Sequence, residues 1–377
     1  MRVLQLLPSL GDGGVERSAV ELAGSLSARG VENWIASKGG RLVEKVVSAG
    51  ANHLTIPVGA KSPVAIFCNA RRLATLIDRL GVDIVHARSR APAWAGYMAA
   101  RYSRRRPAFL TTFHGVYGHS SPVKRWYNSV MLRGEVVIAN SAFIADHLCT
   151  VYGVSRDRIV LAPRGVDSAT FDPDAVSGEA VARLRSEFCA EGVPLLVYVS
   201  RISGWKGHLT LVEALEAIVG RPWKAVFVGG HDSDARCDEL IARISSGPAR
   251  ERILLTGSRS DIPAILKAAD LAFSVATAPE AFGRATIEAG AMATPVVATA
   301  HGGSLETVRG GETGWLVPPG DAGALAGAIT AALDDPEAAR AMGRAARTHV
   351  LAHFTAERTL AAEWSAYDRA LAPRSRD

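Results

Sequence analysis

The sequence predicts an α/β protein built from two Rossmann-like, doubly wound domains. Short runs rich in Val, Leu and Ile alternate with stretches of helical periodicity along the whole chain. The runs are continuously apolar, which is typical of parallel strands buried on both faces, and their alternation with helices gives doubly wound sheets. The chain has 377 residues, whereas one hydrophobic core rarely serves more than about 250–300 residues. We therefore expect two domains that face a cleft at the carboxyl ends of their strands, where such sheets bind ligands.

The first domain is predicted at residues 1–165 and the second at residues 191–355, with a linker at 166–190. The linker is expected because residues 163–182 are rich in Pro, Gly, Asp and Ser and follow no helical or strand period. The last residues, 356–377, have an amphipathic helical pattern and are expected to pack back on the first domain. Strands are expected at 3–8, 33–37, 53–57, 83–88, 108–113, 135–140 and 158–162, and then at 195–200, 224–229, 252–256, 271–276 and 295–299.

The composition indicates an ordinary globular protein of a reducing compartment. Four cysteines are widely spaced and form no CxxC pair, which predicts reduced thiols and a cytoplasmic location. The apolar run after Met1 is only about six residues long and ends at Pro8, so a buried strand is expected there rather than a signal peptide. No segment approaches the roughly 20 apolar residues that a membrane span needs, and we expect a soluble chain.

The two halves of the chain differ in charge. Residues 1–165 hold 22 Lys and Arg against 10 Asp and Glu, a net charge of +12, whereas the remainder holds 21 basic and 27 acidic residues, a net charge of −6. The asymmetry suggests that the N-terminal half faces an anionic partner. Basic runs at 101–106 and 124–133 include aromatic residues and suit the headgroups of a membrane surface, although a solvated basic face explains them equally well. No nucleic-acid-binding motif accompanies them, so nucleic acid is not expected as a partner.

A first candidate for ligand chemistry is the loop after the expected strand at 195–200. Arg201 and Lys206 lie five positions apart in this loop, just before a helical pattern at 208–219. Two cations at this spacing can converge on one diphosphate, and the N-terminus of the following helix adds N–H donors. Each cation by itself would more often be a plain surface charge.

A second candidate runs from Glu280 to Glu288. A helix is expected to begin near Gly283 and Arg284, where the missing side chain of glycine lets a phosphate meet backbone N–H groups. Glu280 then lies in the loop before the helix and Glu288 about one turn or more into it. A carboxylate accepts paired hydrogen bonds from hydroxyl groups, so one Glu suits a hexose and the other a ribose. Either residue alone could be a capping or a solvent-facing carboxylate.

Together the two clusters resemble the Arg-x4-Lys and Glu-x7-Glu signatures of the retaining, two-Rossmann-domain (GT-B) glycosyltransferases of family 4, also called group 1. Arg201 with Lys206 and Glu280 with Glu288 match both spacings in the order of the family. Bacterial members of this kind act in lipopolysaccharide core or surface polysaccharide synthesis.

The resemblance extends over nearly the whole chain. Residues 163–167 (PRGVD) are similar to the start of the family's linker, usually Pro-Asn-Gly-Val-Asp, although Arg164 departs from the commonest form. Residues 294–299 (TPVVAT), 301–303 (HGG) and 314–321 (GWLVPPGD) also match the family.

The resemblance implies a role for each candidate residue. It places Arg201 and Lys206 on the diphosphate, Glu280 on the transferred hexose and Glu288 on the ribose. Further donor-binding residues that it implies are Gly13, Gly14, Phe282, Gly283, Arg284 (through its backbone) and Ala285. It puts His114, which could otherwise be structural, beside the transferred sugar. The acceptor-binding residues expected in or beside the first domain are Glu16, His86 and Arg164, of which His86 could equally be structural.

The expected activity is transfer of a hexose from a UDP- or GDP-sugar to a hydroxyl group of a glycolipid or saccharide acceptor. Retention of anomeric configuration is implied by the resemblance, as is catalysis without a metal or another cofactor. The acceptor is expected in lipopolysaccharide or cell-envelope polysaccharide synthesis, with peripheral contact to the cytoplasmic face of the inner membrane.

Three alternatives stay open beside this interpretation. Residues 232–234 spell Asp-x-Asp, a metal-binding signature of the other main glycosyltransferase fold, but Asp and Ser are also ordinary turn residues. An NAD-dependent oxidoreductase would need a GxGxxG fingerprint after the first strand, and Glu16 stands where its third glycine belongs. A sugar-nucleotide epimerase of the same fold would share the donor site and would need no acceptor.

Overall fold

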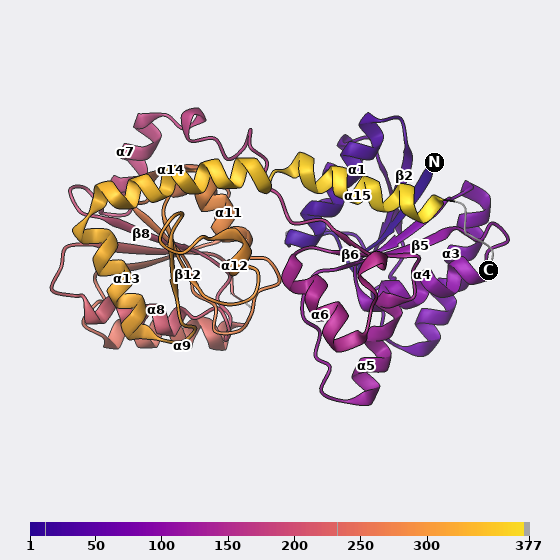
Figure 1. Cartoon of the computed structure of the whole chain (residues 1–377), viewed down its shortest axis with the longest axis horizontal. Helices are drawn as coiled ribbons and strands as arrows, with labels where there is room; N and C mark the ends of the chain where they lie inside the picture. The colour runs from indigo at the N-terminus through magenta and orange to yellow at the C-terminus, as the bar shows by residue number, and fades with distance from the viewer. Residues whose placement is uncertain (12, 232, 373–377) are drawn as a thin grey trace. The chain divides into compact units, whose positions relative to one another are not determined.

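The computed structural model describes residues 1–11, 13–231 and 233–372, which form two compact α/β units (Figure 1). The first unit contains the chain up to Pro163 and again from Thr359 onwards, and the second contains Arg164–Arg358. Both sheets are parallel, as the continuously apolar runs predict, and the two-domain Rossmann-like fold class is confirmed.

In the described residues, the sheet of the first unit has the strand order β3-β2-β1-β4-β5-β6-β7. Its strands are β1 (Arg2–Leu6), β2 (Glu32–Ser37), β3 (Asn52–Thr55), β4 (Ile84–Ala87), β5 (Ala108–Phe113), β6 (Val136–Ala139) and β7 (Ile159–Leu161). Its helices are α1 (Gly14–Ala28), α2 (Val43–Ser48), α3 (Pro63–Leu80), α4 (Arg90–Tyr102), α5 (Pro122–Asn128), α6 (Ala142–Tyr152) and the C-terminal α15 (Ala356–Leu371).

The last helix, α15, is part of the core of the first unit. Ala366, Tyr367 and Ala370 on α15 are buried in one cluster with apolar side chains of α1 and of the sheet, including Leu22 and Ile138. Burial of large apolar side chains such as Leu22 and Ile138 stabilises the unit, because each contributes roughly 1.5–3 kcal/mol when fully removed from water.

The sheet of the second unit has the order β10-β9-β8-β11-β12-β13 in the described residues. Its strands are β8 (Leu195–Val199), β9 (Lys224–Val228), β10 (Ile253–Gly257), β11 (Leu271–Ser274), β12 (Val296–Thr299) and β13 (Trp315–Val317). Its helices are α7 (Gly178–Glu187), α8 (His208–Ala217), α9 (Asp234–Ser246), α10 (Ile262–Ala268), α11 (Arg284–Ala291), α12 (Ser304–Thr307), α13 (Ala322–Asp334) and α14 (Pro336–His353). Apolar side chains of α8, α9 and α13 cover one face of the sheet, and those of α7, α10 and α11 cover the other.

The strands expected from the sequence are all present, with ends within two residues of the expected ones, but two features differ. The edge strand at Trp315–Val317 was not expected, because three residues are too few to show a strand period. The stretch expected to be a linker contains α7, so the linker prediction is wrong for residues 178–187. Ser177 caps this helix by accepting a hydrogen bond from the backbone N–H of Ala180, and Leu184 is buried in the second core.

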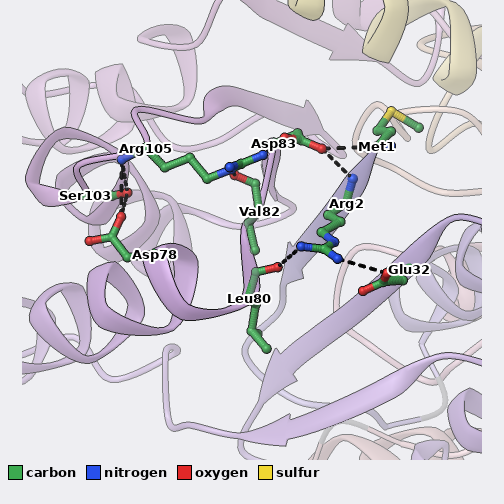
Figure 2. Close-up of polar contacts among 9 residues, drawn as sticks. All are labelled: Met1, Arg2, Glu32, Asp78, Leu80, Val82, Asp83, Ser103 and Arg105. Atoms are coloured by element: carbon green, nitrogen blue, oxygen red, sulfur yellow. Dashed lines mark hydrogen bonds and ion pairs between the residues drawn. The ribbon is translucent and has the colours of Figure 1, made fainter.

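The basic run at 101–106 is partly used to hold the first unit together at the amino ends of its strands (Figure 2). The Arg105 guanidinium donates a hydrogen bond to Asp83 at 2.6 Å and another to the carbonyl oxygen of Val82 at 3.2 Å. Asp78 accepts hydrogen bonds from the Ser103 hydroxyl at 2.5 Å and from the Arg105 backbone N–H at 3.2 Å. The Ser103 hydrogen bond is the main cause that lowers the pKa of Asp78. This part of the run therefore has a structural role, at the edge of the sheet away from the carboxyl ends of the strands.

Among the described residues, no helix combines the length and the apolar character that crossing a membrane requires.

Candidate active site

The topology of the second unit brings the two predicted clusters together. Its strand order runs outward from β8 in one direction and from β11 in the other, so the sheet has its switch point between these two strands. At such a point the loops after the two strands diverge and leave a crevice, where doubly wound sheets bind ligands. The loop after β8 carries Arg201 and Lys206, and the loop after β11 carries Glu280. Residues about 75 positions apart in the sequence therefore lie in one place.

Lys206 and Glu280 form an ion pair at this crevice. The ammonium group of Lys206 donates a hydrogen bond to Glu280 Oε1, and the exposed fractions of the two side chains are only 19% and 14%. The ammonium nitrogen also lies 4.5 Å from the centre of the Trp205 ring, a cation–π contact that further fixes its position. No role was predicted for Trp205 from the sequence, although an aromatic residue next to a cation in a ligand loop is a usable signal. Arg201 lies on the same loop and is exposed.

The loop that carries Lys206 is held close to β11. Gly207 has a left-handed φ of +77°, and a Cβ atom at this position would lie 1.9 Å from the carbonyl oxygen of Val275. Only glycine allows this approach. The carbonyl oxygen of Trp205 accepts a hydrogen bond from the backbone N–H of Thr277 at 2.8 Å, which ties the two loops together.

His208, the first residue of α8, lies beneath this loop. Its ring is buried and packs against Tyr198 with 4.7 Å between ring centres, and the Tyr198 hydroxyl donates a hydrogen bond to the carbonyl oxygen of Lys206. Burial, and then the charge of Lys206, lower the pKa of His208 to about 4. The imidazole is therefore neutral at pH 7 and adds no charge to the site.

This burial predicts a pH dependence of stability. Between pH 6.5 and about 4 the unfolded chain binds a proton at His208 that the folded chain does not bind, so stability falls as the pH falls through this window. The free energy of unfolding should drop by about 2 kcal/mol more between pH 7 and pH 5 in the wild type than in His208→Leu. Urea unfolding of both proteins at the two pH values measures this difference. Equal drops in the two proteins would contradict the assignment to His208.

Glu280 is positioned by a close approach of the loop after β12. Gly302 has a φ of +58°, and a Cβ atom there would lie 2.4 Å from the carbonyl oxygen of Glu280. The same carbonyl oxygen accepts a hydrogen bond from the backbone N–H of Gly303 at 2.9 Å. Helix α11 begins directly beyond, with Gly283 as its N-cap residue at a φ of +85°. The expected arrangement of a carboxylate in the loop before this helix is thus present.

Glu288 lies on α11 and is paired with Arg284, one turn earlier. The guanidinium and carboxylate groups are 3.2 Å apart, so the side chain of Arg284 fixes the carboxylate of Glu288. The predicted binding of a ligand by the backbone of Arg284 stays a prediction. A ribose hydroxyl group that approached Glu288 would meet a carboxylate already held in place.

Phe282 is buried and its ring packs 5.5 Å from the ring of Phe354, so only its backbone is available to a ligand. Ala285 is half-buried on the same helix.

In the first unit, the switch point lies between β1 and β4. Gly13 is the N-cap residue of α1 and Gly14 its first residue, at the carboxyl end of β1. A Cβ atom on Gly13 would lie 2.3 Å from Glu16 Oε2, so the Glu16 carboxylate folds back over the N-terminus of α1, where a negative charge is favourable. His114 directly follows β5, as expected, and is half-buried. The predicted ligand contacts of these residues stay predictions.

The prediction that His86 binds the acceptor is wrong. His86 is completely buried inside β4, and both ring nitrogens have partners in the core. Nδ1 is 2.9 Å from the Tyr367 hydroxyl of α15, and Nε2 is 2.6 Å from the Thr112 hydroxyl of β5. Burial, and then Arg88, hold the pKa of His86 well below its usual value, so the ring is neutral. The reason for the error is that a polar residue near a strand end looks the same in the sequence whether it faces a ligand or the last helix.

Comparisons with known proteins agree with this geometry. Residues 184–349 match the family model described as glycosyl transferases group 1, and residues 12–170 match that of glycosyltransferase family 4. A crystal structure of a glycosyltransferase from Rickettsia africae is 36% identical and superposes with a TM-score of 0.91 over 98% of each chain. The chain belongs to the group 1 glycosyltransferases.

Other relatives of this glycosyltransferase differ in substrate. A GDP-mannose-dependent α-(1-6)-phosphatidylinositol monomannoside mannosyltransferase of Mycolicibacterium smegmatis is 31% identical over 74% of each chain. A D-inositol 3-phosphate glycosyltransferase of Nocardia farcinica is 32% identical over 58% of this chain and 49% of its own length. Several of the curated relatives are thus matched over only about half of their length. HepE of Anabaena, solved in complex with UDP-glucose, shares the fold at 23% identity with a TM-score of 0.84.

Arg164 and the Asp-x-Asp stretch are two further candidates from the sequence of the glycosyltransferase. Arg164 opens the second unit and is buried, and its predicted contact with the acceptor stays a prediction. In the Asp-x-Asp stretch, Asp232 lies outside the described residues. Within the part of the chain that the structure describes, no three His, Cys, Asp or Glu side chains are grouped as metal ligands.

Proposed function

We propose that this glycosyltransferase moves a hexose from a nucleotide diphosphate-sugar to a hydroxyl group of its acceptor, with retention of anomeric configuration. The second unit would bind the donor and the first unit the acceptor. The observation that carries the proposal is the meeting of Lys206, Glu280 and the N-terminus of α11 at the switch point of the second sheet. These are a cation for a diphosphate, a carboxylate for sugar hydroxyl groups and a set of backbone N–H donors.

In the proposed reaction, the bond between the anomeric carbon and the diphosphate breaks through an oxocarbenium-like transition state. Negative charge grows on the leaving diphosphate, and Lys206, Arg201 and the N–H groups near Gly283 are directed at this charge. Fixed hydrogen-bond donors of this type typically contribute about 3–4 kcal/mol each to the stabilisation of the transition state. Glu280 would hold the hydroxyl groups of the hexose and Glu288 those of the ribose.

Retention is proposed to arise by attack on the same face from which the diphosphate leaves. The acceptor oxygen bonds to the anomeric carbon as its proton passes to the leaving phosphate. A double displacement would need a carboxylate on the opposite face of the sugar, and neither Glu280 nor Glu288 is assigned this role. No metal is proposed, because Arg201 and Lys206 already supply positive charge to the diphosphate.

A panel of nucleotides tests the donor half of the proposal. UDP, GDP and ADP, each with their sugars, would be added in a thermal unfolding experiment on the wild type and on Lys206→Ala. A ligand present at 100 times its Kd should stabilise the wild type by about 2.7 kcal/mol. Failure of every nucleotide to raise Tm would sink the proposal. Conversion of a donor without any acceptor would instead favour a sugar-nucleotide epimerase.

For the acceptor, we propose a glycolipid or saccharide of lipopolysaccharide or cell-envelope synthesis, met at the cytoplasmic face of the inner membrane. Helix α5 supports this, because the exposed fractions of Val123 and Trp126 are 74% and 60% and Lys124 and Arg125 lie between them. An apolar and aromatic face with adjacent cations suits a membrane interface with anionic lipids. Co-sedimentation with anionic vesicles should fall in Val123→Ser/Trp126→Ala and not in Val47→Ser, another exposed valine. Unchanged co-sedimentation would exclude a role for α5.

A further inference from the structure

Arg90 lies at the carboxyl end of the first sheet, which is the edge where doubly wound sheets bind ligands. It is the first residue of α4 and directly follows Ser89, the N-cap residue, after the carboxyl end of β4. The first sheet has its switch point between β4 and β1, so the loop after β4 borders the crevice of this unit.

The guanidinium group of Arg90 is held by uncharged groups. Its Cζ atom lies 4.4 Å from the centre of the Tyr117 ring and 5.8 Å from that of Tyr127. Nη1 donates a hydrogen bond to Asn128 Oδ1 at 3.1 Å. Asn128 is itself completely buried and fixed by two hydrogen bonds of its own amide group, to the carbonyl oxygen of Gly118 and to the Tyr152 hydroxyl, both at 3.0 Å. Arg90 is therefore pre-organised although it is half-buried and bears a full positive charge.

Arg88, two positions earlier, shows the contrast. Four of the five N–H groups of its guanidinium donate hydrogen bonds inside the unit, two to Glu363 at 3.2 and 2.9 Å and one each to Gln5 and Ser18. Around Arg90, by comparison, no carboxylate of the described residues lies within ion-pair distance. A half-buried arginine without an acidic partner keeps a planar set of N–H donors of the kind that matches phosphate and carboxylate oxygens.

We propose that Arg90 binds an oxyanion of the acceptor, a phosphate or a carboxylate group carried by the sugar, polyol or lipid that receives the hexose. The inference rests on the proposed function for its assignment to the acceptor. This proposal gives one positive charge of residues 1–165 a specific role as a fixed cation, in place of a role as part of a diffuse basic surface. The acceptor is therefore an anionic molecule, and a neutral analogue binds more weakly.

The test is calorimetric titration of the full chain with inorganic phosphate and, separately, with acetate, in the presence of a saturating concentration of whichever of UDP, GDP and ADP raises Tm most. This nucleotide occupies the donor site, so that the oxyanion reports on the first unit. Arg90→Gln should weaken the binding of the preferred oxyanion by about tenfold or more, and Arg90→Lys by less, since it keeps the charge but loses the planar donors. Arg101→Gln is the matched control, because Arg101 is also on α4 and also stacks on a tyrosine, 5.3 Å from the centre of the Tyr97 ring.

The possible results distinguish failure of this inference from failure of the proposed function. Loss of oxyanion binding in Arg90→Gln, with nucleotide binding and Tm kept, supports the inference, and the preference for phosphate or acetate names the chemical class. Equal oxyanion affinity in the wild type, Arg90→Gln and Arg101→Gln overturns it and leaves the proposed function intact. Absence of UDP, GDP and ADP binding in the wild type overturns the proposed function, and with it the assignment of Arg90 to an acceptor.

Discussion

Replacing Lys206 by alanine should lower kcat by about 100- to 1,000-fold, equivalent to about 2.7–4 kcal/mol of transition-state stabilisation. The ammonium group is half-buried and held by Glu280 and Trp205, so it is pre-organised for a diphosphate without a reorganisation cost at the moment of reaction. Its removal has a second effect, because the Glu280 carboxylate loses its cation and would repel the developing negative charge.

Donor turnover and UDP affinity, measured on the same preparations, check this prediction. Lys224→Ala is a matched control, since Lys224 lies in the same unit at the amino end of β9 and its ammonium group donates a hydrogen bond to the carbonyl oxygen of Glu251. Its loss should leave both quantities unchanged. The double variant Lys206→Ala/Glu280→Gln should bind UDP more tightly than Lys206→Ala, because the unpaired charge is gone. A Lys206→Ala protein with wild-type turnover would contradict the assignment of Lys206 to the diphosphate.

Replacing Glu363 by alanine should lower the free energy of unfolding of the first unit by about 3–5 kcal/mol. Glu363 on α15 bonds both terminal nitrogens of Arg88, and the exposed fractions of the two side chains are 3% and 0%. The substitution leaves a buried guanidinium whose charge has no counterion, which is the costly outcome when a buried ion pair is broken. The hydrogen bonds from Arg88 to Gln5 and Ser18 cannot replace the lost charge.

Urea unfolding followed separately in each unit measures the effect. Asp146→Ala removes an exposed ion pair with Arg156 in the same unit and should cost no more than about 1 kcal/mol. The double variant Arg88→Met/Glu363→Leu should recover much of the loss, because apolar groups of similar volume often replace a buried ion pair without penalty. A loss in Glu363→Ala no larger than that in Asp146→Ala would show that Arg88 reaches water when its partner is removed.

Much of the fold could be predicted from local patterns. Buried parallel strands such as Leu195–Val199 are continuously apolar, and a helix such as α11 starts at a glycine, so both leave a signal within a few residues. Elements without such a signal were missed. The strand at Trp315–Val317 is too short for a period, and α7 has only one fully buried apolar residue, Leu184, in a polar stretch.

Local patterns predict the candidate donor site only as two separate clusters, and it is the resemblance to the family that joins them into one expected site. The spacing of Arg201 and Lys206 and that of Glu280 and Glu288 are local properties of two strand-to-helix loops. The ion pair between Lys206 and Glu280 requires β8 and β11 to be neighbours, which the order of the strands along the chain does not reveal. Arg284 was assigned to its backbone, although it lies four residues before Glu288 on the expected helix, a spacing from which this ion pair could have been predicted.

The sequence by itself determined which residues form strands, where the loops that carry the charged residues lie, and which family the chain resembles, because these depend on short-range patterns. The tertiary structure alone decided which polar groups after β4 of the first unit remain available to a ligand. Glu363 of the last helix forms an ion pair with Arg88 and Tyr367 hydrogen-bonds the neutral ring of His86, whereas Arg90 has no acidic partner in the described residues. The physical reason is that an ion pair forms only where the fold places an opposite charge within a few ångströms. The partner on α15 comes from the opposite end of the chain, so no local pattern near Arg88 reveals it.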